Sequence, residues 1–142
     1  MKQIKHLLIL LILMIGLTSC ATDAQKKEDV PKDGVEVLYF HGKQRCATCQ
    51  AIEKETKALI DSQFADAVKS GKVRFRVVDI TKAENEAIAD KYEITWSSLV
   101  LVKYNNGSET SENLTQFAFA NARSNPAQFK KELAAKINQM LK

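Results

Sequence analysis

The segment that decides the fold is VEVLYFHGKQRCATCQAIEKE, residues 35–55. Residues 35–40 are rich in β-branched and aromatic side chains, and the run is long enough for a strand but too short for a helix. Cys46 and Cys49 follow, and the apolar residues beyond them recur at spacings of three, four and seven, which indicates a helix. We therefore expect the cysteine pair to lie between a strand and a helix.

The first twenty residues form a separate segment. Two lysines precede an apolar run from Leu7 to Leu17, and small residues then lead to Cys20. This order is typical of an export signal, and the run is shorter than the roughly 20 residues of a membrane-spanning helix. We predict a signal peptide over residues 1–19.

Residues 17–20, Leu-Thr-Ser-Cys, resemble the lipobox of bacterial lipoproteins. The resemblance implies that the Cys20 thiol carries a diacylglycerol and that Cys20 becomes the first residue of the mature chain. The expected location is extracytoplasmic, with the chain anchored by its lipid to a bacterial membrane on the periplasmic or cell-surface side, where disulfides persist. Plain secretion, with Cys20 lost, is the alternative.

Composition favours one folded domain behind a tether. Residues 20–34 are polar and contain Pro31 and Gly34, which predicts a flexible tether, and residues 35–142 are long enough for one domain with its own core. The formal charge is +4, and removing the two lysines of the signal peptide leaves +2. A charge this small gives no reason to expect a nucleic-acid partner.

The patterns after the cysteines predict a helix, a strand, a second helix, a hairpin, a short helical piece and a final helix. The corresponding residues are 52–68, 73–80, 83–92, 99–104 with 108–114, 115–122 and 126–141. The first helix has an apolar stripe that reaches Val68 and a break at Asp61-Ser62. Val77 continues the alternation of the strand, and Asn105-Asn106-Gly107 has the chemistry of a hairpin turn.

This order of elements predicts an α/β domain with a right-handed crossover followed by an antiparallel pair. Together with Cys46-Ala47-Thr48-Cys49, Val77-Val78-Asp79 and YEITWSSLVLVKYNNG (92–107), it resembles the thioredoxin-like fold family. The resemblance implies a central mixed sheet of about four strands flanked by helices, with the cysteine pair at the start of the first helix.

Two cysteines separated by two residues can exchange disulfides, because one thiolate attacks and the other thiol resolves the mixed disulfide. A cysteine at a helix start faces unpaired N–H groups and the positive end of the helix dipole, which lower its pKa. We therefore predict that Cys46 attacks and Cys49 resolves, with their disulfide as the only redox group. Lys43 and Arg45 add positive charge, and His41 is a base, a further cation or an exposed loop residue.

Two other uses of the pair are considered. A closed zinc site needs four ligands, whereas the mature chain without Cys20 offers only Cys46, Cys49 and His41. Binding or carrying copper(I) through the two thiolates is the alternative function. A purely structural disulfide is the third interpretation, although a loop closed over two residues restrains little of the unfolded chain.

Some positions depart from the family pattern. Arg45 replaces the tryptophan that usually precedes the first cysteine, and Ser97 replaces the cis-proline opposite the pair. The resemblance implies that Trp96, Ser97 and Ser98 bind substrate backbone, with the bond before Ser97 either trans or strained. The family's buried acid in the preceding strand has no clear counterpart, and Glu36 is the only acid there.

The sequence therefore predicts an extracytoplasmic thiol–disulfide oxidoreductase that acts on protein thiols or disulfides. Such an enzyme needs a membrane partner that delivers or removes electrons. Oxidase, reductase and isomerase are not separated by these residues, because the direction depends on the reduction potential.

Overall fold

The computed structural model describes residues 31–142. The predicted signal peptide, the lipidation site Cys20 and most of the predicted tether lie outside these residues. Within the described part of the chain, no helix is both long enough and apolar enough to cross a membrane.

The order of strands and helices predicted from the sequence is confirmed. The elements are β1 (Gly34–His41), α2 (Ala47–Gln63), α3 (Ala65–Lys69), β2 (Val73–Asp79), the 3-10 turn η1 (Ala83–Asn85), α4 (Glu86–Lys91), β3 (Ser98–Asn105), β4 (Ser108–Asn113), α5 (Thr115–Asn121) and α6 (Pro126–Met140).

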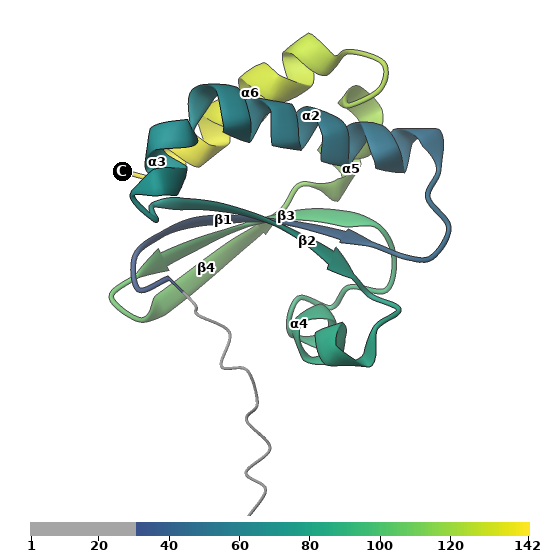
Figure 1. Cartoon of the computed structure of the whole chain (residues 1–142), viewed down its shortest axis with the longest axis horizontal. Coiled ribbons are helices and arrows are strands. Elements are labelled where there is room, and N and C mark those ends of the chain that lie inside the picture. The colour runs from purple at the N-terminus through teal and green to yellow at the C-terminus, as the bar shows by residue number, and fades with distance from the viewer. Residues whose placement is uncertain (1–30) are drawn as a thin grey trace, which may run out of the picture.

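The strands form one mixed sheet in the order β2-β1-β3-β4 (Figure 1). β1 is parallel to β2 and antiparallel to β3, and β3 is antiparallel to β4. β1 therefore lies in the interior of the sheet, which explains why its sequence is almost continuously apolar.

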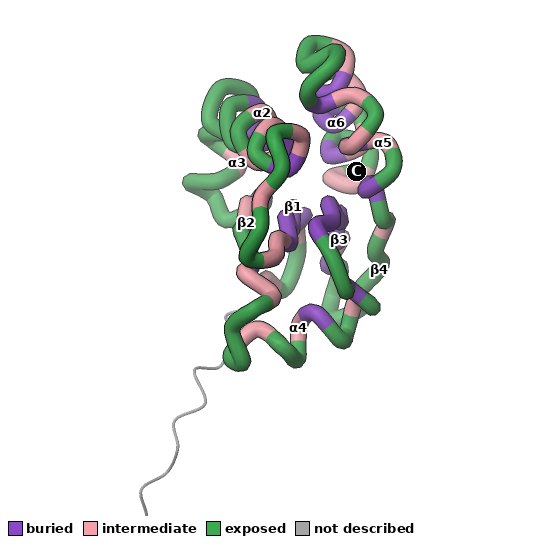
Figure 2. Tube along the Cα trace, turned by 90° about the vertical axis from the view of Figure 1, so that its right-hand side faces the viewer, coloured by how far each residue is buried: buried purple, intermediate pink, exposed green. Residues whose placement is uncertain are grey.

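The two faces of the sheet are covered unequally. Helices α2, α5 and α6 lie over one face, and α4 lies over the other (Figure 1). Buried positions gather along β1 and β3 and on parts of α2 and α6 (Figure 2). Since successive residues of a strand point to opposite faces, Tyr39 joins the core under α2 and α6, whereas Leu38 and Phe40 join the core on the α4 side.

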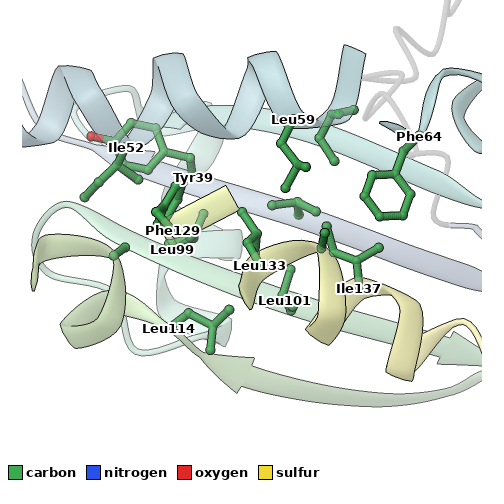
Figure 3. Packing of buried hydrophobic residues seen from close by; sticks show 14 of the residues in the cluster. Tyr39, Ile52, Leu59, Phe64, Leu99, Leu101, Leu114, Phe129, Leu133 and Ile137 are labelled. Atoms are coloured by element: carbon green, nitrogen blue, oxygen red, sulfur yellow. The ribbon is translucent and has the colours of Figure 1, made fainter. Parts of the chain in front are cut away.

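The larger core packs between α2, the sheet and α6 (Figure 3). Its fully buried members include Tyr39, Ile52, Leu59, Leu99, Phe129, Leu133 and Ile137. Ile52 and Leu59 come from one face of α2, as the seven-residue spacing predicts. This packing holds the helix that carries the cysteines firmly on the central strand.

Helix α2 differs from its prediction at its end. Asp61-Ser62 do not interrupt it: the helix continues to Gln63, and the Ser62 hydroxyl donates a hydrogen bond to the Ala58 carbonyl, 2.7 Å away. The break comes at Phe64, whose backbone leaves the helical region at φ −119°. Val68 then falls in α3 and is 42% exposed, so its predicted place on the apolar stripe is wrong.

Two further predictions need correction. Val77 is exposed, because it lies on β2, a strand at the edge of the sheet. The second helix is divided into η1 and α4, and it ends where Glu93 takes a left-handed φ of 55°. The N–H of Ile94 bonds the carbonyl of Ala89 at 2.8 Å, which satisfies a carbonyl at the end of the helix.

The hairpin and the start of the last helix agree with the sequence. Asn106 and Gly107 both have left-handed φ, 49° and 81°, as a two-residue turn of the mirror type requires. The side chain of Asn125 accepts a hydrogen bond from the backbone N–H of Gln128 at 3.3 Å, and Pro126 opens α6.

Candidate active site

The cysteine pair lies at the start of α2, as predicted. Cys46 is the N-cap residue, with φ −67° and ψ 163°, and its Sγ accepts a hydrogen bond from the backbone N–H of Cys49 at 3.0 Å. The two cysteines are joined by a disulfide, with their Cα atoms 5.0 Å apart. The first turn of α2 contains no acidic side chain. The helix dipole therefore acts on Cys46 without a carboxylate in that turn to oppose it.

The two cysteines differ in accessibility. Cys46 is exposed, whereas Cys49 lies one turn into the helix and is 6% exposed. This asymmetry is what a disulfide exchange needs, because the attacking sulfur must meet a substrate and the resolving sulfur must meet only its partner.

Tyr39 supports the pair from the central strand. Its hydroxyl donates a buried hydrogen bond to the backbone carbonyl of Cys49, 2.7 Å away. Burial raises the pKa of Tyr39, while hydrogen bonds with Arg45 and Ser97 act to lower it, and burial dominates. The hydroxyl therefore remains protonated and continues to donate.

Arg45 does not simply add a free positive charge beside Cys46. Its guanidinium forms an ion pair with Glu53, and its central carbon lies 5.8 Å from the centre of the Tyr39 ring. Burial acts to lower the pKa of Arg45, but the hydrogen bond and charge of Glu53 outweigh it and raise the pKa. The charge of Arg45 is therefore permanent and partly compensated.

His41 and Lys43, the other two residues predicted to influence the cysteines, lie at the end of β1 and between β1 and the start of α2, respectively. The His41 ring is 6.2 Å from the Tyr39 ring between centroids, and its Nδ1 lies 3.0 Å from the Gly42 carbonyl oxygen. Lys43 is exposed in the loop. Their influence on the cysteines stays a prediction.

The predicted substrate loop lies against the same site. Ser97 is among the groups that act to lower the pKa of Tyr39, the tyrosine that supports Cys49. Ser97 and Ser98 are buried, and the Ser98 hydroxyl donates to the Trp96 carbonyl at 3.1 Å. Residues 31–142 contain no cis peptide bond, so the bond before Ser97 is trans.

Trp96 offers an exposed aromatic surface, with 56% of its area accessible. Its ring lies 5.3 Å from the Phe119 ring of α5, centroid to centroid. The sequence did not point to Phe119, because its contact with Trp96 depends on how α5 packs beside the loop.

Glu36 is on the wrong face of the sheet to serve the cysteines. Glu36 and Tyr39 are three residues apart on β1, so their side chains point to opposite faces of the sheet. The Glu36 carboxylate is buried, and the Tyr104 hydroxyl donates a hydrogen bond to it at 3.1 Å. Arg76 Nε lies 3.6 Å from the same carboxylate. Glu36 is therefore not the counterpart of the family's buried acid.

Among the described residues, no group of three or more His, Cys, Asp or Glu side chains could hold a metal ion. In this part of the chain, the copper alternative therefore depends on the thiolates of Cys46 and Cys49 alone.

Glu53 is a site residue that sequence reasoning missed, since it also fits a solvated helix face. A usable signal was its spacing: Arg45, Cys49 and Glu53 are four residues apart in turn, and side chains four apart are neighbours on a helix.

Comparison with known proteins gives matches only among solved structures, since no family model and no curated protein matches the chain. The Trx4 domain of ERdj5 is 22% identical, with a TM-score of 0.52, covering 78% of this chain and 82% of that one. A thioredoxin of Malassezia sympodialis is 23% identical, with a TM-score of 0.51 and coverage of 78% and 77%. An uncharacterised thioredoxin-like protein from Clostridium perfringens is 13% identical, with a TM-score of 0.50 and coverage of 80% and 75%.

These likenesses are to the fold, and they agree with the observed topology. The mixed four-stranded sheet, the helices on both faces and the Cys46–Cys49 pair at the start of α2 are the features that the sequence resemblance implied. The chain therefore has a thioredoxin-like fold.

Proposed function

We propose that this protein is a thiol–disulfide oxidoreductase that works through Cys46 and Cys49. The observation that carries the proposal is the position of Cys46 as the N-cap of α2, with its sulfur accepting the N–H of Cys49. In the reduced protein the same N–H and the helix dipole would stabilise a thiolate. A stabilised, exposed thiolate is the nucleophile that disulfide exchange requires.

The reaction transfers two electrons between the protein and its substrate. In the reducing direction, the Cys46 thiolate attacks a substrate disulfide, forms a mixed disulfide and releases one substrate sulfur as a thiolate that takes up a proton. The Cys49 thiol loses its proton and attacks Cys46, which forms the protein disulfide and releases the second substrate sulfur. The oxidising direction is the reverse of these steps.

The substrates are protein thiols or disulfides that dock on the loop formed by Trp96, Ser97 and Ser98. Ser97 acts on the pKa of the tyrosine that supports the pair, and Trp96, its neighbour in the chain, presents an exposed aromatic surface. We also propose, from the N-terminal sequence, that the domain works outside the cytoplasm on a lipid anchor at Cys20 and exchanges electrons with a membrane partner.

The test is reduction of the insulin disulfides by the protein in the presence of dithiothreitol. Cys46→Ser is expected to abolish the catalysed rate, and Cys49→Ser is expected to accumulate a mixed disulfide on Cys46. A Cys46→Ser variant that worked at the parent rate would rule out the mechanism. Copper(I) titration of the reduced protein, with the same two variants, tests the alternative.

A further inference from the structure

An ion pair spans the position of the resolving cysteine. Arg45 directly precedes the N-cap residue Cys46, and Glu53 lies four residues beyond Cys49 on α2. Because residues four apart are neighbours on a helix, the ion pair between Arg45 and Glu53 brackets the position of Cys49. The Gln50 side chain donates to the Arg45 carbonyl at 3.2 Å, which helps to fix the backbone there. The pair is therefore part of the cysteine site.

The environment of this pair gives its charges more influence than those of an ordinary surface pair. The side chains of Arg45 and Glu53 are each 29% exposed, whereas Lys57 and Asp61, a pair on the same helix, are 63% and 60% exposed. The Tyr39 ring lies beneath the guanidinium, and the Tyr39 hydroxyl bonds the Cys49 carbonyl. Water screens shielded charges less than exposed ones, so this pair is better placed than an ordinary surface pair to act on neighbouring groups, and Arg45 directly precedes Cys46 in the chain.

We propose that the Arg45–Glu53 ion pair sets the reduction potential of the Cys46–Cys49 disulfide. This inference rests on the proposed function. Reduction adds two electrons to the disulfide, at the expense of two glutathione thiols that are oxidised to a disulfide. Of the two protons that these thiols release, one protonates Cys49 and the other goes to solvent, because Cys46 persists as a thiolate. Arg45 stabilises that thiolate, and Glu53 holds part of the arginine charge and limits the effect.

The sign of each substitution follows from this arrangement. Without Glu53, the full charge of Arg45 favours the thiolate, so the reduced form gains stability and the potential becomes less negative. Without Arg45, the remaining Glu53 carboxylate disfavours the thiolate, so the potential becomes more negative. Tyr39 is the titratable group that faces the pair from β1, and it stays neutral because burial raises its pKa.

The experiment measures the equilibrium of the full chain with glutathione buffers at pH 7. Glu53→Gln is expected to shift the equilibrium about threefold toward the reduced protein, and Arg45→Met about threefold toward the disulfide, as suits a partly shielded pair. A threefold change is about 14 mV for this two-electron couple. The methionine keeps an apolar stem over the Tyr39 ring.

Glu55→Gln is the matched control, because it removes the same charge from the same helix. Glu55 faces α6, where it pairs with Lys130 at 3.1 Å. Its substitution is expected to leave the potential at the parent value. The alkylation pKa of Cys46 gives a second readout, which should fall in Glu53→Gln and rise in Arg45→Met.

Opposite shifts in the two variants, with the Glu55→Gln potential unchanged, support the inference. Shifts of the same sign, or shifts no larger than that of Glu55→Gln, overturn it, because loss of a merely structural pair would not change the potential in two directions. A parent protein that never equilibrates with glutathione would instead contradict the proposed function itself.

Discussion

The hydroxyl of Tyr39 donates a buried hydrogen bond to the backbone carbonyl of Cys49, 2.7 Å away. This bond joins the central strand β1 to the first turn of α2, at the residue that must resolve the mixed disulfide. It fixes the position of the helix start relative to the sheet, in addition to the apolar packing further along the helix.

Tyr39→Phe removes this bond and keeps the ring in the core. We expect the free energy of unfolding of the oxidised protein to fall by about 1 kcal/mol, the usual net contribution of one hydrogen bond. Urea unfolding measures it. Tyr92→Phe is the control, because its hydroxyl bonds Glu109 at an exposed position, 2.9 Å away, and should cost less. Equal losses in the two variants would contradict the importance of the buried bond.

Trp96→Ala tests the substrate surface. Since more than half of Trp96 is exposed, we expect little change in stability, while KM for a protein disulfide should rise about fivefold, or about 1 kcal/mol, with kcat less affected. Val68→Ala removes an exposed apolar side chain from α3 and should leave KM unchanged. An unaltered KM in Trp96→Ala would show that this ring does not meet the substrate.

The order of the elements and the place of the cysteines were predictable from the sequence because their causes are local. Strand alternation, helical periodicity and the Asn106-Gly107 turn each depend on residues close together in the chain. Where the local period changed at Phe64, the prediction failed for Val68, because a break of one residue rotates everything beyond it to another face.

The polar contacts of the site were not predictable in the same way. The bond from Tyr39 to Cys49 depends on how α2 lies over the sheet, and Phe119 meets Trp96 through the packing of two distant segments. The face taken by Glu36 depends on strand register, because a shift of one residue exchanges the two faces of a strand.

Glu36→Gln tests whether this buried acid has any part in the chemistry. The variant loses the charge that Arg76 and the Tyr104 hydroxyl contact, so we expect a loss of about 1 to 2 kcal/mol in urea unfolding. Burial is the main cause that raises the pKa of Tyr104 to about 12, and the charge of Glu36 adds to it. The pKa of Tyr104 should therefore fall in the Glu36→Gln variant.

The rate of insulin reduction should be unchanged by Glu36→Gln, because the side chain lies on the face opposite Tyr39 and the cysteine pair. Spectroscopic titration of tyrosine in alkali follows the pKa of Tyr104. A variant that stays folded but loses catalysis would place Glu36 in the mechanism, against the geometry.

Asp79 is expected to make the stability of the domain sensitive to acid. At the end of β2 its carboxylate accepts hydrogen bonds from the backbone N–H and the hydroxyl of Thr81, at 3.0 and 2.7 Å. The backbone bond is the largest cause that lowers the pKa of Asp79 below its usual value. The unfolded chain therefore binds a proton more readily than the folded one, so this stabilisation is complete above the unfolded pKa and is lost as the pH falls through the folded pKa.

Asp79→Ala should consequently lower stability at neutral pH, and the difference from the parent should shrink as the pH falls from about 5 to about 2. Urea unfolding across that range, on both proteins, gives the two curves to compare. Convergence in acid is the expected result because protonation removes from the parent the same interaction that the substitution removes. Curves that stayed parallel would mean that the carboxylate charge of Asp79 adds nothing to the turn after β2.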